Sequence, residues 1–179
     1  MTRTVETMLD ELARLNIRLR PNTKRELLFS NFDEAEIERG GFGTLLIAIG
    51  SEYEMVFEDG DQFELQPLSD DVLYFGHDCI DGPEDYAPVV DDLCRLTSGD
   101  LRFDDWTDYT QYNLRFDINF IDEAIFGLLQ SHLVNTGSKR RFAIYPLDLH
   151  SLMICQPPEV NAAISKLTGL GFREVEVAN

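Results

Sequence analysis

The chain has 179 residues, a length typical of one domain or two small ones. Its 44% hydrophobic and 11% aromatic content excludes intrinsic disorder, because such a composition can bury a core. Its 33 acidic and 15 basic residues give a net charge of −18, which excludes direct binding to nucleic acid and argues against docking on anionic lipid, since both need clustered Lys and Arg.

The first half of the chain predicts helices followed mainly by strands. In chain order we expect an amphipathic helix over 4–16, the start of a strand at 17–20, short helices over 24–29 and 33–38, a buried strand over 44–49, a hairpin around the turn 58–61, a strand over 71–80 and a helix over 83–96. The segment 44–49 is uniformly apolar, so its assignment depends on length and not on periodicity.

The second half predicts the same mixture of elements. We expect two strands over 101–104 and 114–117 joined by the loop 105–113, a helix capped by Asn119, strands over 141–145 and 149–154, a helix opened by Pro157 and Pro158, and a last strand over 172–177. Because strands and helices do not alternate regularly, the sequence predicts an α+β fold. We expect a single compact domain over 1–179, with a mostly antiparallel sheet packed with about four helices.

The ends and the cysteines favour a cytoplasmic protein. No apolar stretch of the kind found in secretory signals follows Met1, and the longest apolar run, over 45–49, is far too short to cross a membrane. The three cysteines, Cys79, Cys94 and Cys155, are odd in number and widely spaced, which is atypical of a disulfide framework. We therefore expect reduced, buried thiols.

The negative charge is concentrated in the middle of the chain. Residues 40–125 hold 21 acidic and three basic residues, a net charge of −18, while the flanking segments 1–39 and 126–179 carry −1 and +1. From 40 to 94 there are 14 acidic residues and no Lys or Arg. Such a one-signed segment accelerates the encounter with a basic protein. The alternative is that the charge only keeps the protein soluble.

Motifs for catalysis or cofactor binding fail on inspection. The glycines of 40–44 lack the Lys of a phosphate-binding loop, and the sequence after 59–61 lacks the Gly of a calcium-binding loop. The triplet 77–79 contains His and Cys but no patterned further ligands for zinc. We therefore predict no catalytic residue, no metal and no cofactor. Paired carboxylates, as in glycoside hydrolases, remain an open alternative.

The stretch 104–112 is the most informative part of the sequence. It contains the only Trp of the chain, two Tyr and three Asp, with no Lys or Arg. Trp and Tyr are the usual anchor residues of protein interfaces, and carboxylates around them would pair with Arg or Lys of a partner. Alternatively, Trp106 covers the core beneath a hairpin loop. The predicted partner-binding residues are Asp104, Asp105, Trp106, Asp108, Tyr109, Tyr112, Glu58, Asp59, Asp61, Asp81, Glu84 and Asp85.

In overall character the chain resembles the immunity proteins of bacterial polymorphic and contact-dependent toxin systems. The resemblance depends on the base-free acidic stretch 40–94 and on the loop 104–112. It implies a stoichiometric inhibitor that binds a cognate toxin domain, often a basic nuclease, and blocks its active site or substrate surface. It implies a basic protein as partner, with no direct contact to nucleic acid or membrane.

We hypothesise that the acids of 52–64, 70–85 and 104–108 form a negative face that steers onto the basic groove of such a toxin, where the aromatic residues of the loop anchor it. Neutralising Asp104 and Asp105 together with Asp108 should then slow association. The alternatives are a DNA mimic that inhibits restriction or other DNA-binding proteins, a small enzyme, and an acidic protein without such a partner. A deep pocket lined by two or more titratable groups with perturbed pKa values would favour the enzyme.

Overall fold

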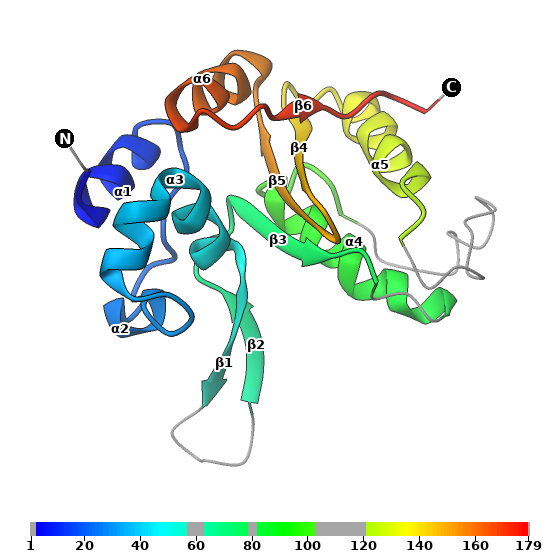
Figure 1. Cartoon of the computed structure of the whole chain (residues 1–179). Helices are drawn as coiled ribbons and strands as arrows, with labels where there is room; N and C mark the ends of the chain where they lie inside the picture. Colours follow the sequence, from blue (N-terminus) through cyan, green and yellow to red (C-terminus); the bar gives the residue numbers. More distant parts are fainter. Residues whose placement is uncertain (1–2, 57–62, 79–81, 103–120, 179) are drawn as a thin grey trace.

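A computed structural model describes residues 3–56, 63–78, 82–102 and 121–178 of the chain (Figure 1). The elements in chain order are α1 (Val5–Ala13), α2 (Arg25–Leu28), α3 (Glu34–Gly50), β1 (Glu52–Val56), β2 (Phe63–Pro67), β3 (Val72–Gly76), the 3-10 turn η1 (Pro83–Asp85), α4 (Tyr86–Leu96), α5 (Ala124–Asn135), β4 (Arg141–Leu147), β5 (His150–Gln156), α6 (Pro158–Thr168) and β6 (Arg173–Glu174). These ranges contain six α-helices instead of about four. The predicted α+β class with antiparallel sheets is confirmed.

The larger sheet has four strands in the order β3-β5-β4-β6, and each neighbouring pair is antiparallel. Its central strand, β5, is buried from Ser151 to Gln156. Leu152 and Ile154 pack in one hydrophobic core, while Met153 and Cys155 pack in another. Because successive side chains of a strand point to opposite faces, this uniformly apolar strand requires a sheet that is covered on both sides.

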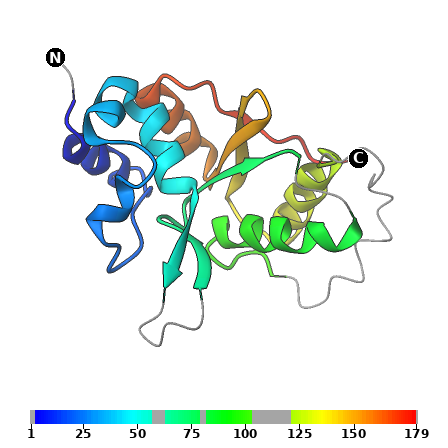
Figure 2. The same ribbon diagram turned by 60° about the horizontal axis from the view of Figure 1, so that its bottom comes forward.

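Helices cover both faces of this sheet (Figures 1 and 2). The first core joins one face to α1, α2, α3 and α6, and the second core joins the other face to α4 and α5. The sheet is therefore the middle layer of three. The expected assignment of 1–179 to a single domain stays a prediction.

Helix boundaries follow capping residues where the sequence provides them. The Thr4 hydroxyl accepts the backbone N–H of Thr7 at the start of α1, and Pro158 occupies the first turn of α6. Gly169 ends α6 with φ 74°, a left-handed conformation that glycine adopts without steric cost. Both helices are predicted correctly from the sequence.

The strand expected over 44–49 is wrong, because this segment is the second half of α3. The helix begins at a capping box formed by Asp33 and Glu36, and it kinks at Gly41, whose φ of 66° and ψ of −149° suit only glycine. Leu45, Leu46, Ala48 and Ile49 are all buried in the first core. A helix enclosed by neighbours has apolar residues on every side, and its sequence then shows no helical period.

The predicted hairpin is confirmed as β1 and β2, which pair antiparallel with Tyr53 opposite Gln66. The Tyr53 hydroxyl donates to the Ala48 carbonyl at 2.7 Å, so the base of the hairpin is fixed to the end of α3. The hairpin extends away from the helical layers (Figure 1). Its turn lies outside the described residues.

Three further expectations are corrected. Residues 17–20 form no strand, although the Arg20 N–H donates to the Leu68 carbonyl at 2.8 Å. The helix expected from Asn119 begins at Ala124, which is exposed and not part of the core. The strand expected over 172–177 is reduced to the two residues of β6. The strands expected over 101–104 and 114–117 fall almost entirely outside the described residues.

Candidate partner-binding surface

Ten of the twelve predicted partner-binding residues lie outside the described part of the chain. They are Glu58, Asp59, Asp61, Asp81, Asp104, Asp105, Trp106, Asp108, Tyr109 and Tyr112. The other two, Glu84 and Asp85, form the turn η1 that leads into α4. Glu84 is exposed, and the Asp85 carboxylate accepts the Gly82 N–H at 2.8 Å.

A groove lies between α4, β3 and the junction of α3 with β1, and we call it the acidic groove. It has a volume of about 450 Å³. Its described lining consists of Ser51, Glu52, Leu73, Tyr74, Phe75, Gly76, Asp85, Pro88, Val89 and Asp92. One of the predicted residues, Asp85, is thus brought together with two acids, Glu52 and Asp92, that sequence analysis did not single out.

Carboxylates beside this groove are crowded and partly desolvated. Burial, and to a smaller extent the nearby Asp92 charge, raises the pKa of Glu52 above its ordinary value. Burial and the same Asp92 charge also raise the pKa of Asp91. Among the described residues, Arg95 is the base that approaches these acids, and it is bonded to Asp92 at 3.0 Å. Their ionised forms would therefore be stabilised by an external cation.

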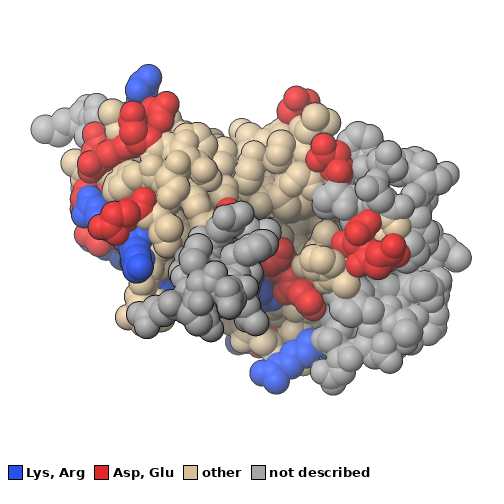
Figure 3. All heavy atoms as spheres, turned by 90° about the horizontal axis from the view of Figure 1, so that it is seen from below, with Lys and Arg blue, Asp and Glu red and all other residues tan. Residues whose placement is uncertain are grey.

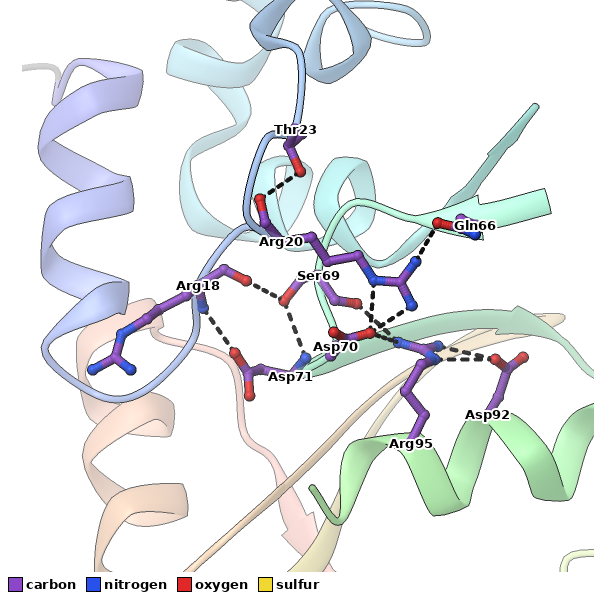
Figure 4. Close-up of polar contacts among 9 residues, drawn as sticks. All are labelled: Arg18, Arg20, Thr23, Gln66, Ser69, Asp70, Asp71, Asp92 and Arg95. Carbon is purple, nitrogen blue, oxygen red and sulfur yellow. Dashed lines mark hydrogen bonds and ion pairs between the residues drawn. The ribbon is translucent and has the colours of Figure 1, made fainter. Parts of the chain in front are cut away.

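Two acids of the base-free stretch have a structural role instead (Figure 4). Arg20 bonds Asp70 through its Nε at 2.7 Å, and it also donates to the Gln66 side chain at 2.8 Å. The Asp71 carboxylate accepts the backbone N–H of Arg18 at 3.0 Å. The hypothesis that all acids of 70–85 face a partner is therefore corrected for Asp70 and Asp71.

Arg95 of α4 completes this network from the opposite side. It donates to the Ser69 carbonyl at 2.9 Å and lies 3.7 Å from Asp70, in addition to its bond with Asp92. The Ser69 hydroxyl in turn donates to the Arg18 carbonyl at 2.6 Å. The network joins the segment after α1, the segment before β3, and α4, and so fixes the walls of the acidic groove.

Acids of the N-terminal helices and of the stretch 52–91 differ in their ion pairs. On α1, Glu6 pairs with Arg25 and Glu11 pairs with Arg3, while Asp10 of α1 and Glu26 of α2 have no ion pair among the described residues. In the stretch 52–91 four exposed acids have no Lys or Arg partner among the described residues: Glu52, Asp78, Glu84 and Asp91. Seen from below the hairpin, acidic side chains alternate with basic ones over the N-terminal helices and predominate on the α4 side (Figure 3).

A second cavity, of about 510 Å³, contains a polar pair that the sequence analysis missed. His77 Nε2 and the Ser151 hydroxyl lie 2.8 Å apart on its wall, with Glu123 and Arg173 also lining it. Burial lowers the pKa of His77 below its ordinary value, which favours the neutral ring. Ser151 has no exposed surface. The sequence separation of 74 residues gave no indication of this contact.

Of the metal-capable residues, the described ones remain dispersed. Within residues 3–56, 63–78, 82–102 and 121–178, no three His, Cys, Asp or Glu side chains come together as metal ligands. Cys94 and Cys155 are free thiols, and burial raises the pKa of each to about 12. Thiols with such pKa values are poor nucleophiles at neutral pH. Cys79 lies outside the described residues.

The chain matches no protein-family model, no curated protein and no solved structure. Among the described helices, none combines the length and apolarity needed to cross a membrane.

Proposed function

We propose that this chain is an inhibitor of the immunity-protein kind, which binds a basic toxin domain through the acidic side of α4 and the acidic groove. The simplest partner is a nuclease, whose substrate surface must be basic to bind phosphates. Binding there excludes the substrate and so blocks the toxin.

One observation supports this proposal above the others. The exposed acids Glu52, Asp78, Glu84 and Asp91 lack a basic partner among the described residues, and no Lys or Arg occurs in the sequence from 40 to 94. A surface that serves only solubility would intersperse both signs. Unpaired acids on one side give the directed field that steers a basic partner into contact.

The experiment has two stages. The tagged full chain captures proteins from its native cells at low salt, and the captured basic protein is then purified. Its catalytic activity is measured against increasing amounts of the chain, together with the association rate at several salt concentrations. We expect inhibition that is complete at one chain per partner, with an association rate that falls steeply as salt rises.

A charge-matched pair of variants tests the surface. Glu84→Gln with Asp91→Asn removes two charges beside α4, and Glu26→Gln with Glu159→Gln removes two exposed charges elsewhere. The first double variant should slow association by roughly 3–10-fold at low salt, and the second should change it little. Equal effects of the two, or a captured partner that is bound and not inhibited, would contradict the proposal. Inhibition of several unrelated DNA-binding proteins would instead identify a DNA mimic.

The cavity of His77 favours a small enzyme as the second candidate. A serine hydroxyl 2.8 Å from a histidine ring nitrogen is the arrangement that activates a nucleophile when the ring is neutral. Burial lowers the pKa of His77 in this cavity, and Ser151 is fully buried. Labelling by a fluorophosphonate probe that is lost in Ser151→Ala would support the enzyme, and absence of labelling would eliminate it.

A further inference from the structure

We propose that the acidic groove binds the guanidinium group of a single arginine of the basic partner, an inference that rests on the proposed function. Its lining combines hydrogen-bond acceptors with an apolar wall, and the ligand chemistry follows from these two properties.

Acceptors predominate among the polar side chains of the described lining, in which the Tyr74 hydroxyl is the group that can also donate. Glu52, Asp85 and Asp92 contribute carboxylates. The Ser51 hydroxyl donates its hydrogen to the Ile47 carbonyl at 2.7 Å, so it has only lone pairs left to offer. A ligand that matches these carboxylates must bring hydrogen-bond donors and a positive charge. Among side chains, Arg and Lys bring both and have no acceptor.

The edge of the sheet adds a further acceptor. The His77 N–H donates to the Leu149 carbonyl of the β4–β5 turn at 2.9 Å, and bonding alternates from residue to residue in an antiparallel pair. Counting back along β3, the peptide groups of Phe75 face β5, whereas those of Tyr74 face away from it. β3 is the outermost strand on this side, so the Tyr74 carbonyl has no partner strand on its outer edge, and Tyr74 lines the groove.

The charge of Glu52 is not balanced by an ion pair among the described residues. Arg95 is bonded to Asp92 and to the Ser69 carbonyl, and it makes no ion pair with Glu52. A second cation at the Glu52 side would compensate the remaining charge.

The apolar wall favours arginine over lysine. Phe75, Pro88 and Val89 line the groove beside the acids, and the volume of about 450 Å³ accommodates a long side chain. The guanidinium is planar and weakly hydrated, so it can lie against apolar surface while its N–H groups reach carboxylates. The lysine ammonium is compact and strongly hydrated, and it loses more solvation in the same place.

The test uses the full chain labelled with nitrogen-15 and three small probes: N-acetylarginine amide, N-acetyllysine amide and N-acetylnorleucine amide. Backbone amide spectra are recorded during titration. We expect the arginine probe to shift the amides of Glu52, Phe75 and Val89 with millimolar affinity, and the lysine probe to bind at least threefold more weakly. The norleucine probe, which has no donor group in its side chain, should leave these amides unshifted.

Variants separate the groove from general charge. Glu52→Gln keeps the shape and should weaken the arginine probe by about 5–10-fold. Glu159→Gln, an exposed acid of α6, is the matched control and should leave the affinity unchanged. Val89→Arg places a guanidinium in the groove from within and should abolish probe binding. Absent shifts at the groove, equal binding of norleucine, tighter binding of lysine, or equal effects of the two glutamate variants would each overturn the proposal.

The failure of this inference differs from a failure of the proposed function. If Glu52→Gln leaves a captured basic partner bound and inhibited as by the original chain, the arginine site is wrong and the inhibitor function stands. If the arginine probe binds as expected and the captured partner is not inhibited, the site is real and the inhibitor function is wrong.

Discussion

Gly50 is the last residue of α3, and replacing it by alanine should destabilise the protein. The added Cβ would lie 2.8 Å from Val72 Cγ1, 3.0 Å from the Tyr74 backbone nitrogen and 3.3 Å from the Leu73 carbonyl carbon. A methyl group can turn away, whereas the backbone of β3 is held by its pairing with β5. Inserting a methyl group into a packed core costs about 1–3 kcal/mol, and alanine in a helix recovers about 0.5–1 kcal/mol.

We therefore expect Gly50→Ala to lower the free energy of unfolding by about 1–2 kcal/mol, which for a chain of this size lowers Tm by about 3–6 °C. Gly43→Ala is the matched control in the same helix, because its Cβ would meet only Leu170 Cδ2 at 3.9 Å. That variant should gain about 0.5–1 kcal/mol. Urea unfolding followed by circular dichroism measures both. Equal stability of the two variants would refute the packing of α3 against β3.

Three more variants test the polar interactions. Arg95→Met should lower the free energy of unfolding by about 1.5–3 kcal/mol in urea titrations, since it leaves Asp92 without its ion-pair partner. The control is Arg18→Met, because the Arg18 guanidinium makes one hydrogen bond among the described residues, to Asn16 at 3.4 Å. This variant should change the free energy of unfolding by less than about 0.5 kcal/mol. Because the pKa of Glu52 is raised in the folded state, its ionisation destabilises the protein as pH rises; Glu52→Gln should have a higher Tm than the original chain at pH 7 and an equal one at about pH 4. Because the pKa of His77 is lower in the folded state, the unfolded chain binds this proton more readily as the pH falls below about 6.5. Tm should therefore fall from pH 7 to about 5, and the fall should be smaller in His77→Gln.

Elements that are marked by local sequence signals, such as alternation or a capping residue, were predictable from the sequence. The hairpin of β1 and β2 shows alternation on both strands, and α6 begins at Pro158 and ends before Gly169. The second half of α3 was not predictable, because its burial on all sides removes the pattern that distinguishes helix from strand. The boundary of α5 was also missed, since the helix begins at Ala124, whose N–H donates to the Asp122 side chain, and the predicted capping residue Asn119 lies outside the described residues.

The candidate site was predictable in kind and not in composition. The charge imbalance of the middle segment predicts a basic partner, which stays a prediction, and Asp85, one of the predicted partner-binding residues, lines the acidic groove. Contacts between distant segments decide which acids form ion pairs within the protein. Asp70 meets Arg20 across 50 residues, and no local pattern reveals such a pair.

The pairing of β3 with β5 has a consequence for folding during synthesis on the ribosome. Tyr74 lies opposite Leu152, so the strand that completes both cores is synthesised 78 residues after its neighbour. Until β5 leaves the exit tunnel, the apolar sides of α1, α3 and α4 have no sheet to cover. Closing so long a loop is slow, and the growing chain must depend on its many like charges or on chaperones to avoid aggregation in the interval.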